Sequence, residues 1–158
     1  MLYTLAHPLL FRLHAERAHQ LSIAALKMAP LPAVGFAHVS LRQKLAGLSF
    51  TNPVGLAPGY DKDAEVPVEI LRLGFGFTEV GTLTPLPQKG NQRPRLFRLV
   101  EDRAVINRMG FNNQGQAEAI RRLQNLPPNA LLGPLGINVG ANKDSDDRIA
   151  DYTTGVRV

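Results

Sequence analysis

The chain has 158 residues, of which 44% are hydrophobic and 20% charged, a balance typical of globular proteins and too apolar for a disordered one. It contains no cysteine, which excludes a disulfide framework, a thiolate metal site and a cysteine nucleophile, so redox chemistry would need a cofactor. The net charge of +5 favours anionic partners, but the basic residues are dispersed and there is no Trp, so we predict no nucleic-acid partner. No metal site is predicted either.

Residues 1–40 form the first predicted unit. Their leucines recur at the spacing of one or two short helices, which we expect to be broken near Pro8. Basic residues outnumber the single acid, Glu16, so the helices could be a basic amphipathic pair in a membrane interface, or ordinary helices packed on a core. No run of about 18 apolar residues is present to span a bilayer. Prolines at 30 and 32 end the helices, and residues 30–40 read as a linker.

The second unit, residues 41–158, begins with an extended pair turned at Gly47. This pair leads into the apolar run Val54–Ala57, which predicts a buried strand that stops at Pro58-Gly59. Helical spacing then runs from Ala64 to Gly74, with Pro67 tolerable only in the first turn.

A second strand is predicted at residues 77–84. A strand, a helix and a strand in this order imply a parallel pair with a right-handed crossover. Thr82 then lies at the carboxyl end of its strand, where the first strand also places Lys62, and ligands bind at such ends. An isolated Asp-Lys pair is more often a solvated loop pair than a ligand site. The functional interpretation of Asp61-Lys62 therefore depends on the neighbouring residues.

Residues 95–107 predict a hairpin, which we expect to point into the same crevice. The asparagine-rich segment 107–113 follows, and its amides suit either a heterocycle with amide-like edges or an ordinary turn. A helix at 116–126 and a third strand at 131–139, with Asn138 near its end, come next. The acidic run at 144–147 is typical of the N-terminus of a last helix.

Seven sequence blocks now stand in order along the chain. They are HAERAH (14–19), NPVGLA (52–57), GYDK (59–62), EVGTLTP (79–85), PRLFR (94–98), INRMGFNN (106–113) and GINVG (136–140). Together they resemble the quinone-dependent, class 2 dihydroorotate dehydrogenases of pyrimidine biosynthesis. Pro58 stands where alanine is more common in that family.

The resemblance implies an α/β fold, a TIM (β/α)8 barrel that holds FMN and orotate above the carboxyl ends of its strands. Here only the N-terminal portion of the barrel would be present, preceded by a helical membrane-associating segment. The implied FMN contacts are Ala57, Pro58, Gly59, Tyr60, Asp61, Lys62, Thr82 and Asn138. Lys62 would also reach the substrate carboxylate, and the implied orotate contacts further include Asn107, Arg108, Met109, Gly110 and Phe111.

In such enzymes dihydroorotate loses a proton to a serine base and a hydride to the flavin, and a ubiquinone-type quinone reoxidises the flavin. The resemblance places the serine beyond Val158, so no catalytic residue is expected within residues 1–158. The N-terminal helices would form the quinone entrance, which implies a peripheral protein of the inner (cytoplasmic) membrane.

An eight-stranded barrel needs about 250 residues, whereas this chain supplies at most three barrel strands. We therefore expect a truncated chain that is inactive alone and prone to associate, because half a barrel leaves an open strand edge. Two alternatives remain. One is a membrane-associating fragment without catalysis, and the other is a different FMN-dependent TIM-barrel oxidoreductase.

Overall fold

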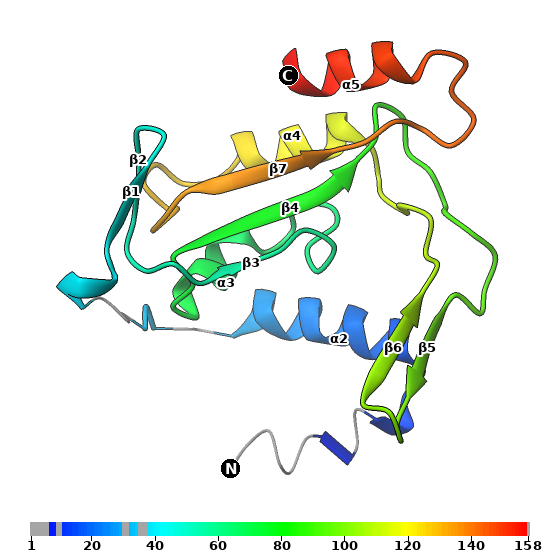
Figure 1. The fold of residues 1–158 in the computed structure, drawn as a ribbon, viewed down its shortest axis with the longest axis horizontal. Coiled ribbons are helices and arrows are strands. Elements are labelled where there is room, and N and C mark those ends of the chain that lie inside the picture. The colour runs from blue at the N-terminus through cyan, green and yellow to red at the C-terminus, as the bar shows by residue number, and fades with distance from the viewer. Residues whose placement is uncertain (1–6, 9–10, 30–31, 35–37, 158) are drawn as a thin grey trace.

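The computed structural model describes residues 7–8, 11–29, 32–34 and 38–157, and Figure 1 shows the fold. The helices are α2 (Ala15–Met28), α3 (Pro67–Arg72), α4 (Gln116–Gln124) and α5 (Arg148–Arg157), with a 3-10 turn at Val39–Leu41. The strands are β1 (Gln43–Leu45), β2 (Leu48–Phe50), β3 (Gly55–Leu56), β4 (Phe77–Leu83), β5 (Leu96–Leu99), β6 (Ala104–Asn107) and β7 (Leu135–Val139). The chain is thus an α/β protein, as the sequence predicts.

A parallel sheet lies at the centre of the described residues, with strand order β3-β4-β7. Gly55 pairs with Phe77, and Gly81 pairs with Asn138, so the carboxyl ends of all three strands lie at one edge. The predicted parallel strands at 77–84 and 131–139 are confirmed, although β7 begins only at Leu135. Both outer edges of this sheet lack a strand partner within the part of the chain that the structure describes.

The first strand is shorter and less buried than predicted. Only Gly55 and Leu56 pair with β4, and Val54 is 61% exposed. The prediction of a buried strand over Val54–Ala57 is therefore wrong, because β3 is the edge strand of the sheet and is covered by fewer neighbours than a central parallel strand.

Two apolar clusters join the helices to the sheet. In the first, Ala119 of α4 packs with Ala64 and with Val80 of β4. In the second, Ile23 of α2 packs against Ile70 of α3. In Figure 1, α2 and α5 lie on opposite sides of the sheet, beyond its two edges. Both clusters include residues of the loop after β3, namely Ala64 in the first and Val66 in the second, and so hold that loop against the helices.

The described N-terminal residues contain a helix interruption just before α2. Residues 7–8 and 11–12 are helical and an interruption lies at Leu13–His14, whereas residues 9–10, beside the break predicted near Pro8, lie outside the described residues. His14 forms the N-cap of α2, with its Nδ1 atom accepting a hydrogen bond from Glu16 N. A side-chain cap of this kind starts a new helix. Parts of the predicted linker, residues 30–31 and 35–37, lie outside the described residues.

The hairpin β5–β6 forms as predicted, but it does not point into the crevice. Figure 1 shows it running away from the carboxyl ends of β4 and β7 to lie beside the start of α2. Arg98 of β5 donates a hydrogen bond of 2.8 Å to Leu13 O, and its guanidinium lies 4.6 Å from the centre of the Phe11 ring. These contacts with the N-terminal segment hold the hairpin in this direction.

No helix among the described residues is both long and apolar enough to cross a bilayer.

Candidate active site

Thr82 and Asn138 meet at the carboxyl ends of β4 and β7. The Asn138 Nδ2 atom donates a hydrogen bond of 2.7 Å to Thr82 Oγ1. A Cβ atom added to Gly140 would lie 2.5 Å from Thr82 Cγ2, so only glycine leaves room for this threonine. The pair opens onto a cavity of about 520 Å³ that is also lined by Gly110 and Phe111. Two hydrogen-bonding side chains from neighbouring strands therefore line the same cavity.

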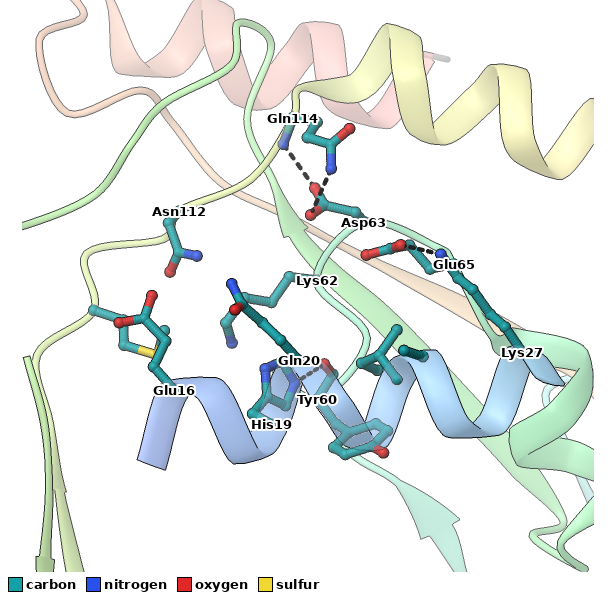
Figure 2. A pocket seen from close by; sticks show the side chains of 13 residues that line it. Glu16, His19, Gln20, Lys27, Tyr60, Lys62, Asp63, Glu65, Asn112 and Gln114 are labelled. Carbon is teal, nitrogen blue, oxygen red and sulfur yellow. Dashed lines mark hydrogen bonds and ion pairs between the residues drawn. The ribbon is translucent and has the colours of Figure 1, made fainter. Parts of the chain in front are cut away.

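Lys62 lines a second cavity, of about 290 Å³, between α2 and the loops that follow β3 and β6. Figure 2 shows it among Glu16, His19 and Asn112, which come from two different parts of the chain. Lys62 Nζ also donates a hydrogen bond to Gly59 O. The lysine is only half-buried, so water still reaches part of its side chain.

Burial lowers the pKa of Lys62 below its ordinary value of 10.5. The charge of Arg95 lowers the pKa further, whereas the carboxylates of Asp63 and Glu16 raise it. A cation that has lost part of its hydration interacts more strongly with an anion than a fully solvated one. The loop thus presents a lysine suited to binding an anionic group.

The loop after β3 is fixed by its own side chains. Asp61 is 1% exposed, and its carboxylate accepts hydrogen bonds of 2.8 Å from Glu65 N and from Val66 N. Burial raises the pKa of Asp61, and these N–H groups act in the opposite direction. Gly81 N donates to Asp61 O at 2.9 Å, which ties the loop to β4 beside Thr82. The side chain of Asp61 is therefore used in folding this loop.

Tyr60 joins the same loop to α2. Its hydroxyl lies 2.9 Å from Ser22 Oγ, its carbonyl lies 2.7 Å from His19 Nε2, and its ring stacks edge-on against that of His19. Gly59 adopts a φ of +107°, and an added Cβ atom there would meet only Lys62 Nζ, at 3.8 Å. The backbone at Gly59 is therefore open to a ligand, as a close approach requires.

Residues 107–111 form the wall between the two cavities. Met109 is buried and lines the Lys62 cavity, whereas Gly110 and Phe111 line the cavity at Thr82. Asn107 is exposed, and its Oδ1 atom accepts a hydrogen bond of 2.9 Å from Met109 N. Arg108 turns towards the hairpin, where it donates to Pro94 O at 3.0 Å. Of the predicted segment, Asn107 and Arg108 line neither of the two cavities.

Sequence reasoning missed a buried ion pair that borders the site. Glu16 of α2 and Arg95 both have side chains 5% exposed, and Arg95 Nη2 lies 2.5 Å from Glu16 Oε1. The available signal was the lone acid in a basic N-terminal segment, because such a residue requires a partner once it is buried. Its partner lies 79 positions away and could not be identified from spacing.

The donors at the carboxyl edge fit a planar heterocycle that carries amide-like edges and an anionic group. Lys62 offers a cation, Asn138 and Thr82 offer neutral donors and acceptors, and Gly59 leaves the backbone open. The described residues contain no cluster of three or more histidine, aspartate or glutamate side chains that could hold a metal ion.

A family model described as "Dihydroorotate dehydrogenase" matches residues 40–158. The dihydroorotate dehydrogenase (quinone) of Erythrobacter litoralis is 62% identical over 157 residues, which cover 99% of this chain and 45% of that protein. The enzyme of the same name from Sphingopyxis alaskensis is 62% identical over 155 residues, with 97% and 43% covered. The chain therefore spans less than half the length of these curated relatives.

Solved structures agree with the sequence relatives. A crystal structure of DHODH from Eimeria tenella in complex with ferulenol superposes with a TM-score of 0.80 at 40% sequence identity. The match covers 90% of this chain and 40% of that one. The ligand-free form from the same organism gives a TM-score of 0.78.

Proposed function

This chain belongs to the dihydroorotate dehydrogenase family, and from that premise we propose that the protein oxidises dihydroorotate to orotate in de novo pyrimidine biosynthesis. FMN would be the resident cofactor and a ubiquinone-type quinone the electron acceptor. The observation that carries the proposal is that the loop carrying Lys62 is bonded to β4 at Gly81, so that Lys62, Thr82 and Asn138 all lie at the carboxyl edge of one parallel sheet. The relatives named as quinone enzymes, at about 60% identity, support the choice of acceptor.

We propose that β3, β4 and β7 correspond to the first three strands of a TIM barrel, with ligands above their carboxyl ends. FMN would be held by the open backbone around Ala57, Pro58 and Gly59, by Lys62, and by the bonded pair Thr82 and Asn138. A bound flavin supplies a hydride acceptor. The protein's own part is to orient this group and to keep water from it.

The proposed orotate contacts are Lys62 and residues 107–111, which we name the substrate segment. The Lys62 ammonium binds the carboxylate of the substrate, and in a partly dry site this ion pair is stronger than in water. Met109 shields the ammonium from solvent on the side of the substrate segment. We assign no general base within residues 1–158, and the serine base is proposed to follow Val158.

Orotate binding should weaken at a lower pH than the one at which an ordinary lysine loses its proton. Because burial lowers the pKa of Lys62, its ammonium is lost below the pH at which an ordinary lysine titrates. The affinity for orotate, measured through the flavin spectrum across a pH series, should be constant at lower pH and fall above the pKa of Lys62 in the free protein. Affinity that stays constant beyond pH 10.5 would contradict this assignment.

We further propose that the N-terminal segment lies peripherally on the inner (cytoplasmic) membrane and admits the quinone there. Leu21 is 53% exposed and Met28 84% exposed, and their spacing of seven places them on one face of α2. Phe11 and Leu13 add exposed apolar surface before the helix, and Arg17 is exposed close by. Such a surface suits the boundary between headgroups and acyl chains.

Exchange of Leu21 and Met28 for glutamate should reduce co-sedimentation of the protein with vesicles of mixed neutral and anionic phospholipid at least severalfold. The matched control is Val105→Glu, because Val105 is 60% exposed on the hairpin strand β6. Equal vesicle binding by both variants would remove the support for α2 as the membrane contact.

The proposed function is tested by dihydroorotate-driven reduction of a soluble ubiquinone analogue by the full-length natural protein. Quinone reduction at a rate that follows flavin content is expected. Flavin reduction by another substrate, with none by dihydroorotate, would favour a different FMN-dependent barrel oxidoreductase. Vesicle binding by a protein that takes up no flavin would favour a non-catalytic membrane protein.

A further inference from the structure

Arg95 connects three parts of the molecule that surround the proposed orotate site. Its Nη2 and Nε atoms donate to the two carboxylate oxygens of Glu16 in α2, at 2.5 and 3.4 Å. Its Nη1 atom donates to Lys89 O at 2.6 Å and to Asn91 O at 3.0 Å. The side chain is buried, so these bonds are not exchanged freely with water.

The loop that Arg95 holds is bonded in turn to the substrate segment. Asn91 N donates to Met109 O at 2.9 Å, and Asn91 Nδ2 donates to Arg108 O at 2.8 Å. Arg108 N donates to Arg95 O at 2.9 Å. A Cβ atom on Gly110 would lie 2.9 Å from the Asn91 side chain, so the two segments also pack closely. A shift of the guanidinium would therefore displace residues 108–110.

Glu16 fixes that guanidinium from the side of α2. It is 4% exposed, also accepts a hydrogen bond of 2.9 Å from Arg93, and lines the Lys62 cavity (Figure 2). A buried carboxylate that loses its charge leaves its arginine uncompensated, which is strongly destabilising. The position of α2 is thereby linked to the geometry of the loop that contains Lys89 and Asn91.

We propose that Arg95 is a positioning residue for the substrate segment and that Glu16 holds Arg95 in place. The orotate site then adopts its binding conformation only when α2 is packed in the position seen here. This inference rests on the proposed function for the identity of the ligand. In this proposal neither Arg95 nor Glu16 contacts the substrate, and both act through the backbone of residues 108–110.

The test is Glu16→Gln in the full-length natural protein, with Glu118→Gln as the matched control. Glu118, in α4, is also paired with arginines, but it lines neither cavity. We expect Glu16→Gln to retain its flavin and to bind orotate roughly tenfold to a hundredfold more weakly, since small misplacements near a site have effects of that size. The control should bind orotate as the wild type does.

A double variant separates positioning from general stability. Replacing both Glu16 and Arg95 with methionine removes the buried charges together, so its unfolding temperature should recover relative to Glu16→Gln. Orotate binding should remain weak, because the loss of Arg95 removes the donor to Lys89 O and Asn91 O. Wild-type orotate affinity in the double variant would overturn the inference.

Amide hydrogen exchange gives a readout that needs no substrate. In Glu16→Gln the amides of Arg108 and Asn91 should exchange at least tenfold faster than in the Glu118→Gln control. Unchanged exchange at both would overturn the inference even if the wild-type protein bound no orotate. Failure of the wild type to bind orotate or oxidise dihydroorotate, with faster exchange in the variant, would instead count against the proposed function.

Discussion

Replacing Lys62 with methionine should weaken orotate binding by about two orders of magnitude in the full-length protein. The methionine keeps most of the apolar stem that packs in the cavity but removes the ammonium, so the substrate carboxylate would enter a partly dry site without a counter-ion. Truncating one partner of such a pair costs roughly 2–5 kcal/mol, and about 2.8 kcal/mol corresponds to a hundredfold change in affinity. Titration of the flavin spectrum with orotate measures the effect.

Lys44→Met is the control for the loss of a positive charge. Lys44 is exposed on β1, at the opposite end of the sheet from the carboxyl edge. Its replacement should leave orotate affinity unchanged. If Lys62→Met binds orotate as tightly as Lys44→Met does, the lysine does not contact the substrate and the proposed site is misplaced.

Replacing Asp61 with alanine should lower the free energy of unfolding by about 2–4 kcal/mol. The carboxylate accepts hydrogen bonds from Glu65 N and Val66 N, and both amides would lose their partner inside the protein. Each buried donor left unpaired costs roughly 1–3 kcal/mol. Asp61→Asn should lose less, because its amide oxygen can still accept one of the two bonds. Equilibrium urea unfolding measures both.

Asp102→Ala provides the comparison, since Asp102 lies exposed in the turn between β5 and β6. Its effect should stay within about 0.5 kcal/mol. An Asp61→Ala protein as stable as this control would show that the two N–H groups find other partners, and that the carboxylate is free for a ligand.

The sequence predicts those elements whose signals are local. β4 alternates between more and less buried positions, α4 ends just before a pair of prolines, and the β1–β2 turn contains a glycine at φ +80°. Each of these signals lies within about ten residues, so neighbouring residues alone determine the structure. The edge of the sheet that collects Lys62, Thr82 and Asn138 follows from the same signals, because parallel strands end together.

The remaining features depend on contacts between distant residues. The helix predicted from Ala64 begins only at Pro67, because the Asp61 carboxylate binds the amides of the two residues before that proline. The hairpin direction depends on Arg98 meeting the backbone of Leu13. The pairing of Glu16 with a residue 79 positions away leaves no periodic trace in the sequence. Such pairings appear only once the chain is folded.

The central claim is that the edge holding Lys62, Thr82 and Asn138 belongs to a site for FMN and dihydroorotate. The most direct test is the visible absorption spectrum of the purified full-length protein, recorded without oxygen before and after dihydroorotate is added. The proposed function predicts an oxidised-flavin band that bleaches on addition and returns when a quinone follows. A protein that carries flavin which dihydroorotate leaves oxidised would contradict it.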